Sequence, residues 1–231
     1  MEASLLAKSA AGVLGLGTAT AGAVYFGRDL VGGEDKVKTP IKELIKTANP
    51  HKRLIEGSTV SDPHWKEVWK EYRNANLNKD VDSWNIQGWQ KPTGNVTNSD
   101  DASSHFISAC SSKLNEEVES SKDPLYLQVI SYCTRDALIS DLIKEKGNGK
   151  TLLSKEGNDS EAWKVVWTSY KTGNTNKAKG QDKWGLSDWD TKNNDDSAPN
   201  SFKDKCKEKS EKKTVDSSED DYKEVLDWCT K

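Results

Sequence analysis

Apolar residues are scarce in this sequence. Aliphatic, aromatic and sulfur-containing side chains make up 33% of its 231 residues, against roughly 45–50% in an average globular chain, a share that also counts glycine. Such a chain cannot build one large core, but it can build small cores if large side chains carry them. Nine Trp, against three Phe and one Met, suit small cores, because each buried aromatic side chain covers about 150–250 Å².

A surface of a single charge sign is also missing. The net charge is −3, and Lys and acidic residues are interspersed, so no basic face can neutralise the phosphates of a nucleic acid. The most basic segment, residues 203–213, holds six Lys, but Asp204, Glu208 and Glu211 interrupt it. We therefore expect no nucleic-acid partner, and we interpret this segment as a solvated helix face.

Catalytic signatures are absent as well. The sequence has no G-x-S-x-G, no H-E-x-x-H, no P-loop and no Rossmann fingerprint. It has no C-x-x-C, and its three His (His51, His64 and His105) all lie in the first half of the chain, which argues against a metal site and a redox enzyme. We predict that the protein is not an enzyme and binds no cofactor or metal. A hydrolase whose acid pair is brought together only by folding is the alternative.

Charge is missing from residues 9–26, a stretch of 18 residues made mainly of Ala and Gly. About 18 residues are just enough to cross a hydrocarbon core of roughly 30 Å. We expect residues 1–26 to form a signal anchor that attaches the protein to a membrane, and residues 27–36 to form a stalk. The alternatives are a signal peptide cleaved at the A-x-A pattern of residues 19–21, which would release the rest of the chain, and a buried soluble helix.

The charges that flank this stretch bear on its orientation in a membrane. Lys8 precedes the stretch and Arg28 and Lys36 follow it. This charge distribution weakly favours a cytoplasmic position for the rest of the chain, although long hydrophilic domains cross membranes largely regardless of flanking charge.

The rest of the chain matches itself at offsets of 96 to 100 residues. All four Cys and eight of the nine Trp fall in register, and the offset changes only in polar stretches typical of loops. We infer two tandem copies of one small module, copy one at residues 37–134 and copy two at residues 135–231. The largest matched residues are Trp65 and Trp163, Trp69 and Trp167, Tyr72 and Tyr170, Trp84 and Trp184, Trp89 and Trp189, Phe106 and Phe202, and Tyr126 and Tyr222.

The spacing of matched residues predicts a mainly helical fold. Trp65, Val68, Trp69 and Tyr72 stand at i, i+3, i+4 and i+7, which is one face of a helix. Asp62-Pro63 supplies an N-cap followed by Pro at the first helical position. Helical spacing recurs at Tyr126 to Cys133, at Tyr222 to Cys229, and in short helices that open the copies at Ile41 and Ile139. The segment from Trp84 to Trp89 and its counterpart in copy two remain open between a short helix and an extended arm.

Cysteines are few and regularly placed. Cys110 and Cys133 in copy one, and Cys206 and Cys229 in copy two, are each 23 residues apart, with a turn-like stretch between them. Two helices folded back at that turn bring the two Cys together, so we predict one disulfide within each copy that staples an antiparallel helical hairpin. Four reduced, buried Cys are the alternative. The disulfides would indicate an oxidising, extracytoplasmic compartment.

Two roles are open for the Trp residues. Those of the helix at residues 65–72 and of its counterpart share a face with Val and Tyr, which indicates a core position. For Trp84, Trp89, Trp184 and Trp189 we favour the core, with an exposed platform that stacks on sugar rings or anchors a protein partner as the alternative. That alternative predicts a carbohydrate-binding module.

Four features of the chain carry a resemblance to known proteins: the leader MEASLLAKSAAGVLGLGTATAGAVYF, the W-x-x-x-W-x-x-Y helix, the W-x-[IL]-x-x-W element and the paired Cys. With these features the whole chain resembles large paralogous families of uncharacterised proteins in haemotropic mycoplasmas. The resemblance implies a membrane-associated, surface-exposed protein that varies the antigenic surface or contacts host cells. It assigns no functional residues. We therefore expect a membrane-tethered extracytoplasmic protein whose partner is an unidentified protein or glycan.

Overall fold

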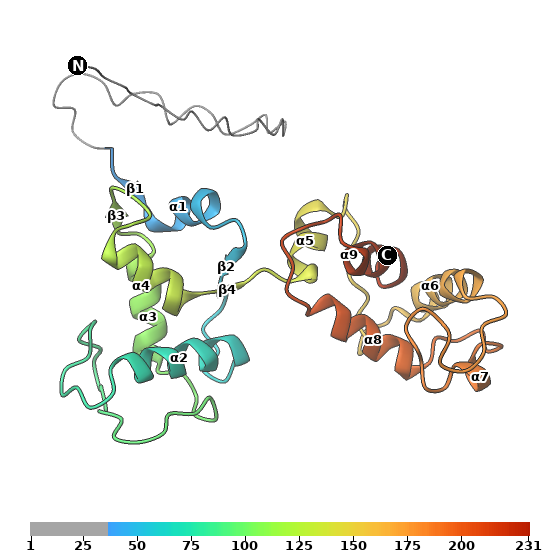
Figure 1. Ribbon diagram of the computed structural model, residues 1–231, viewed down its shortest axis with the longest axis horizontal. Coiled ribbons are helices and arrows are strands. Elements are labelled where there is room, and N and C mark those ends of the chain that lie inside the picture. Colours follow the sequence, from blue (N-terminus) through green and yellow to red (C-terminus); the bar gives the residue numbers. More distant parts are fainter. Residues whose placement is uncertain (1–36) are drawn as a thin grey trace, which may run out of the picture. The chain divides into compact units, whose positions relative to one another are not determined.

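The computed structural model describes residues 37–231 (Figure 1). The expectations for residues 1–26 and 27–36, an anchor or signal peptide and a stalk, lie outside the described residues. Within the described range the chain is mainly helical, as the periodicity predicts, and it carries two disulfides. No helix of residues 37–231 combines the length and the hydropathy of a membrane span.

Copy one begins and ends with short antiparallel strand pairs that hold its helices together. Strands β1 and β3 pair with each other, and β2 pairs with β4 over three residues. Strand β4 crosses the expected end of copy one, so the chain passes into copy two without a separate linker. The elements are β1 (Thr39–Pro40), α1 (Ile41–Ala48), β2 (Lys52–Leu54), α2 (Pro63–Ala75), α3 (Ser104–Lys113), β3 (Glu117–Val118), α4 (Pro124–Cys133) and β4 (Thr134–Asp136).

Copy two repeats this order at the matched positions. Single antiparallel bridges, Leu138 to Lys213 and Leu152 to Thr230, replace the strand pairs of copy one. A short extra helix, α7, begins at Trp189. The elements are α5 (Ile139–Lys146), α6 (Ser160–Gly173), α7 (Trp189–Lys192), α8 (Asn200–Ser210) and α9 (Asp220–Trp228).

Local sequence explains where α2 and α4 begin. The Asp62 carboxylate accepts hydrogen bonds from the amides of His64 and Trp65 at 2.8 and 3.3 Å, and the Asp123 carboxylate accepts one from the amide of Leu125 at 2.8 Å. In both helices a Pro follows the cap, where its missing N–H costs nothing. Helix α6 differs, because the carboxylate of its N-cap Asp159 accepts the amide of Ser154 instead.

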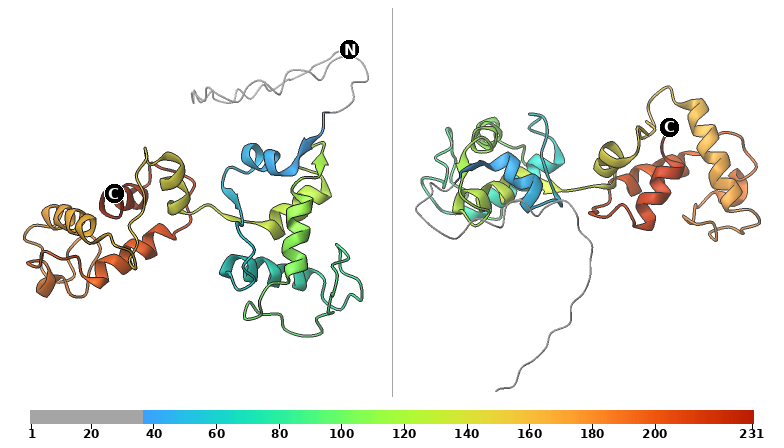
Figure 2. Two further views of the ribbon diagram at one scale, coloured as in Figure 1. Left: turned by 180° about the vertical axis from the view of Figure 1, so that it is seen from behind. Right: turned by 90° about the horizontal axis from the view of Figure 1, so that it is seen from above.

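The predicted disulfide hairpins are present in both copies. Cys110 bonds to Cys133 between α3 and α4, and Cys206 bonds to Cys229 between α8 and α9, with 5.5 Å between the Cα atoms of each pair. The helices of each hairpin lie side by side, which is clear for α8 and α9 in Figures 1 and 2. The within-copy pairing is confirmed.

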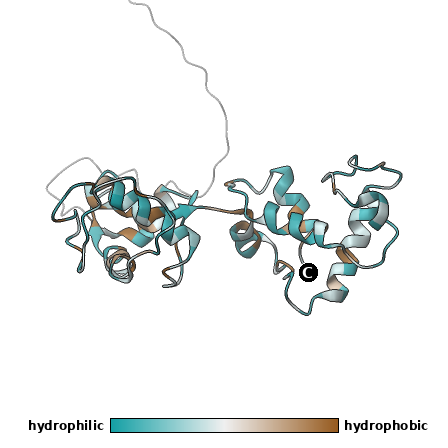
Figure 3. Ribbon diagram, turned by 90° about the horizontal axis from the view of Figure 1, so that it is seen from below, coloured by the Kyte–Doolittle hydropathy of each residue, from teal (hydrophilic) through white to brown (hydrophobic). Residues whose placement is uncertain are grey.

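Buried apolar residues fall into two clusters, one drawn from residues 41–133 and the other from residues 139–229. Each cluster has matched members, including the first Ile of the copy, a Phe, a Tyr and both Cys. Hydrophilic colours run along most of the ribbon in Figure 3, as the low apolar content predicts. A small number of large side chains therefore fills each cluster.

Candidate functional site

A Tyr ring lies at the centre of each cluster. Tyr72 is fully buried, and the centre of its ring lies 5.0 to 6.0 Å from the centres of five other aromatic rings. Tyr170 is buried in the same way, with five ring centres at 4.9 to 5.8 Å. Such edge-to-face and offset contacts stabilise each pair beyond the area that it buries. The rings around Tyr72 belong to Trp69, Trp84, Trp89, Phe106 and Tyr132, and those around Tyr170 to Trp167, Trp184, Trp189, Phe202 and Trp228.

The four Trp residues proposed as a stacking platform lie within these aromatic clusters. Trp184 and Trp189 are buried, and Trp84 and Trp89 are half-buried. Their indole N–H groups are already used inside the protein: Trp89 and Trp189 donate to backbone carbonyls, Trp84 donates to Gln128, and Trp184 donates to Glu224. The arrangement favours the core role for all four.

Segments 84–89 and 184–189 are successive turns rather than a short helix or an extended arm, with Trp189 opening α7. Asn85 and Gly185 occupy the same place in the two turns and both have positive φ, of 51° and 63°. Asn and Gly adopt this left-handed conformation more readily than other residues. The turn therefore has the same backbone shape in both copies.

Asp82 and Asp182 hold these turns in place. The Asp182 carboxylate accepts the Tyr170 hydroxyl at 2.5 Å and the Leu186 amide at 3.0 Å. Asp82 accepts the Tyr72 hydroxyl and the amides of Trp84 and Ile86. Burial and the neighbouring carboxylate both raise the pKa of each Tyr far above its ordinary value, so the hydroxyl stays a hydrogen-bond donor.

A buried Asn supports the same turn from the other side. The Asn76 side chain donates to the Tyr72 carbonyl at 2.9 Å and accepts the Ser83 amide at 2.9 Å. Asn174 makes the equivalent bonds to Tyr170 and Lys183, at 2.8 and 2.6 Å. The repeat therefore extends beyond the apolar and Cys residues to four buried polar ones that also stand in register: Asn76, Asp82, Asn174 and Asp182.

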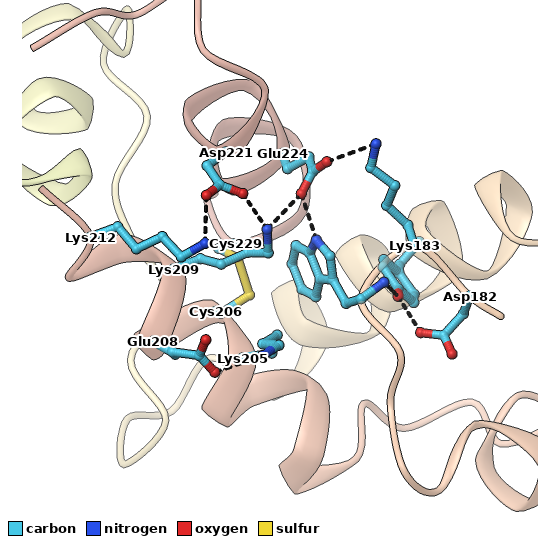
Figure 4. A network of polar contacts seen from close by, with 12 residues as sticks. Asp182, Lys183, Lys205, Cys206, Glu208, Lys209, Lys212, Asp221, Glu224 and Cys229 are labelled. Carbon is cyan, nitrogen blue, oxygen red and sulfur yellow. Dashed lines mark hydrogen bonds and ion pairs between the residues drawn. A yellow bond between two sulfur atoms is a disulfide. The ribbon is translucent and has the colours of Figure 1, made fainter. Parts of the chain in front are cut away.

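The two copies differ in the group that accepts the indole N–H of the first Trp in the turn, and Figure 4 shows the network around this group in copy two. In copy two, Glu224 accepts the Trp184 N–H at 2.7 Å and the Lys209 ammonium at 2.9 Å, and pairs with Lys183 at 3.2 Å. Lys209 also donates to Asp221. The side chains of Lys209 and Glu224 are each only 10% exposed, so this is a largely buried ion pair.

The charges of this network stabilise one another. Burial acts to raise the pKa of Glu224, but hydrogen bonds from Lys209, Trp184 and Lys183 outweigh it and lower that pKa below its ordinary value. Hydrogen bonds from Lys209 and Lys212 likewise lower the pKa of Asp221. Burial acts to lower the pKa of Lys209, and its two carboxylate partners outweigh burial and raise it. All three groups are therefore charged at neutral pH.

Copy one keeps the geometry without the two carboxylates. Gln128 replaces Glu224 and accepts the Trp84 N–H at 2.6 Å, and Leu125 replaces Asp221. Lys113 lies 5.2 Å from the centre of the Trp84 ring, as Lys209 lies 5.4 Å from that of Trp184. A neutral hydrogen bond is therefore enough to fix this Trp, and the charges of copy two are an addition to the shared frame.

A depression of about 420 Å³ lies beside this network in copy two. It is formed by the end of α6, the segment from Lys177 to Lys183, and α9. We call it the Trp228 depression, after the aromatic residue in its lining, which also includes Gly173, Gln181, Lys183, Glu224 and Asp227. No group of three or more His, Cys, Asp or Glu placed to hold a metal ion occurs among residues 37–231.

Comparisons with protein-family models, with curated proteins and with solved structures find no match to this chain. The likeness to the paralogous families of haemotropic mycoplasmas therefore stays an expectation from the sequence, and the case for a function depends on the geometry above.

Proposed function

We propose that this protein is a binding protein of the cell surface, without enzymatic activity, in which two tandem helical modules are held outside the cytoplasm by the N-terminal segment. The observation that carries the proposal is the disulfide in each copy. Disulfides form and persist in oxidising compartments and are rare in the cytosol. A position outside the cytoplasm follows, despite the charges that flank residues 9–26.

The small cores give the disulfides a structural purpose. Closing a loop of 23 residues contributes about 3 kcal/mol in the chain-entropy model. A module of about 97 residues with few apolar side chains gains a large share of its stability from such a closure. The staple therefore suits a small module exposed to an extracellular environment.

The tandem architecture is supported by the repetition of the interior. The Tyr–Asp hydrogen bond, the Asn that supports the turn, and the five rings around each Tyr recur at matched positions. Outside this frame the copies diverge, as in the change from the exposed Leu127 to the exposed Lys223. One scaffold that carries two different surfaces suits a binding or antigenic role, in line with what the resemblance implies.

Protease treatment of intact native cells tests the location. We expect the region of copy two to be lost from intact cells, as detected with an antibody against it, while a cytoplasmic marker remains. Retention of copy two until the cells are lysed would overturn the extracytoplasmic proposal. If the leader is cleaved and the protein is released, copy two is found in the medium instead.

Peptide mapping without reduction, after free thiols are blocked in the native cell, tests the carrying observation. We expect one linked pair of peptides containing Cys110 and Cys133, and another containing Cys206 and Cys229. Four blocked, unlinked Cys would remove the argument for an oxidising compartment.

A further inference from the structure

The indole N–H of Trp228 has no hydrogen-bond partner among the described residues of the protein. Seven of the nine donate their N–H to a partner inside the protein. Trp69 and Trp228 make no such bond within residues 37–231, and neither nitrogen is among the buried polar atoms that lack a partner. Of these two, Trp228 lines the depression and Trp69 does not. Because the half-buried Trp228 side chain lines the depression in copy two, its N–H is available to a molecule bound there.

Other polar groups of the depression are uncommitted too. Within the described chain the Asp227 carboxylate and the Lys177 ammonium have no ion-pair partner, whereas Lys183 and Lys223 are paired with Glu224 and Asp220. The lining of the depression therefore offers a carboxylate that accepts hydrogen bonds, an ammonium that donates them, and an indole with a free N–H.

The position of Asp227 is unfavourable for folding. It lies in the last turn of α9, which contains no basic residue, and a negative charge there faces the negative end of the helix dipole. At the matched position copy one has Ser131. The fold therefore gains nothing from this carboxylate, which is consistent with a role in binding.

The corresponding surface of copy one is partly apolar and carries a single charged residue, Lys79, at the position of Lys177. Val81, Leu127 and Tyr132 stand where copy two has Gln181, Lys223 and Trp228, and the side chains of Val81 and Leu127 are 65% and 53% exposed. Because the underlying frame is the same, the acidic residues and the indole of the Trp228 depression are found in copy two alone.

The chemistry of the lining selects the class of ligand. Three Lys and three acidic residues line the depression, so their charges balance and a strongly anionic ligand gains little from the site. An apolar ligand is disfavoured by the polar walls, because sites for apolar molecules are lined mainly by hydrophobic side chains. A sugar ring offers an apolar face to the indole and hydroxyls that both donate and accept hydrogen bonds.

From this arrangement we infer that copy two binds a saccharide in the Trp228 depression, with a ring against the Trp228 indole and hydroxyls on the Asp227 carboxylate and the Trp228 N–H. The inference rests on the proposed binding function and names its ligand class. The saccharide site inferred here lies at Trp228 rather than at the platform of Trp84, Trp89, Trp184 and Trp189, which was the alternative role for those residues.

Gly173 offers a way to close the site without touching its polar groups. It is exposed at the end of α6, and a Cβ atom added there would lie 3.8 Å from the Trp228 ring, an ordinary contact distance. A long side chain at this position extends over the indole. Gly173→Leu therefore obstructs the depression beside the indole, whereas Asp227→Ser removes one hydrogen-bonding group and introduces the residue that copy one has at this position.

The test uses the full chain on an array of printed neutral, sialylated and sulfated oligosaccharides. We expect binding to at least one neutral or sialylated saccharide, weaker binding to the sulfated ones, and at least a tenfold loss for Asp227→Ser and for Gly173→Leu. Ser131→Asp, the matched change in copy one, should leave binding unchanged. Near-UV circular dichroism checks that each variant keeps its aromatic packing.

Two results would overturn the inference: no printed saccharide bound above background by the unaltered chain, or full binding retained by both Asp227→Ser and Gly173→Leu. Either result leaves the surface location intact, because protease treatment of cells reports that location independently. As a second measurement, titration with the best-bound saccharide should change Trp fluorescence in the unaltered chain and change it less in Trp228→Tyr.

Discussion

At the scale of single residues, the buried Tyr–Asp bond is the feature on which the turn depends. Tyr170→Phe removes a hydroxyl that donates to the Asp182 carboxylate and accepts the Trp184 amide. Hydrogen bonds to charged groups contribute about 1.5–3 kcal/mol, and a buried partner left unsatisfied costs a similar amount. We expect Tyr170→Phe to lower the free energy of unfolding by about 2–3 kcal/mol, measured by urea titration.

Tyr126→Phe is the matched control for that prediction. The Tyr126 hydroxyl donates to the neutral side chain of Asn49 at 2.6 Å, and neutral hydrogen bonds contribute only about 0.5–1.5 kcal/mol. Equal losses for the two variants would show that the carboxylate gives the buried Tyr no special role.

The ion pair between Lys209 and Glu224 in copy two should make the stability of the protein depend on pH. The folded state lowers the pKa of Glu224, so the resulting stabilisation is fully present above the unfolded pKa of about 4.3 and is lost as pH falls through the lower, folded value. We expect Glu224→Gln to lower the free energy of unfolding by about 1–3 kcal/mol at pH 7. The difference from the unaltered chain should shrink as pH falls from about 5 toward 3.

Urea titrations of both chains at several pH values measure that difference. The Trp184 N–H can still donate to the Gln oxygen, as it does to Gln128 in copy one, so the turn itself should survive. A gap that stays constant across the pH range would contradict the assignment of the stabilisation to the ionised carboxylate.

Sequence patterns identified the buried residues better than the polar ones. Helical spacing is a property of apolar residues, so it identified Tyr72, Tyr170 and the Trp residues as core candidates. Asp82 and Asn76 are polar and stand outside any periodic face, and their roles depend on a turn whose path the spacing does not specify. The free N–H of Trp228 was equally hidden, because a count of Trp residues does not show which N–H groups find partners.

At the scale of elements, α6 ends on a residue that weakens it. Gly173 is its last residue and makes no contact that a methyl group would disturb, since an added Cβ would lie 3.8 Å from Trp228. Gly costs a helix about 0.5–1 kcal/mol relative to Ala through backbone entropy. We expect Gly173→Ala to raise the free energy of unfolding by up to about 1 kcal/mol in a urea titration; a loss of stability would mean that α6 needs the glycine.

The second prediction at this scale concerns how much each disulfide contributes to the free energy of unfolding. All four Cys are buried, so replacement by Ala avoids introducing a buried hydroxyl. Cys110→Ala with Cys133→Ala, and separately Cys206→Ala with Cys229→Ala, should each cost about 3 kcal/mol, because both loops span 23 residues. Urea titrations followed by far-UV circular dichroism measure the loss. A cost below about 1 kcal/mol in either pair would show that packing alone holds that hairpin.

Element boundaries were predictable where the sequence signals them chemically. Asp-Pro marked the starts of α2 and α4, and the interval between the Cys residues marked the hairpins. The strands of two or three residues carry no alternating pattern long enough to recognise. Segments 84–89 and 184–189 were ambiguous because an Asp side chain, rather than a backbone ladder, organises them.

At the scale of the whole molecule, the two separate clusters of buried residues bear on whether each copy can fold without the other. Each cluster draws its members from one copy, and each copy has its own disulfide. A fragment of copy one must include the residues that pair with β2. Strand β2 pairs with residues as far as Asp136, and the amide of Ala137 donates to the His51 carbonyl at 2.8 Å. Copy one therefore needs a few residues beyond its expected end at residue 134.

We therefore expect fragments 37–138 and 135–231 each to fold alone, with near-UV circular dichroism typical of packed Trp and a cooperative urea transition. The control is fragment 37–133, which keeps the disulfide and the aromatic cluster but lacks β4. Loss of the pairing between β2 and β4 exposes the backbone of Lys52 to Leu54, so this fragment should be measurably less stable than fragment 37–138. A disordered fragment 135–231 would show instead that copy two depends on copy one, which would contradict the proposal of two self-contained modules.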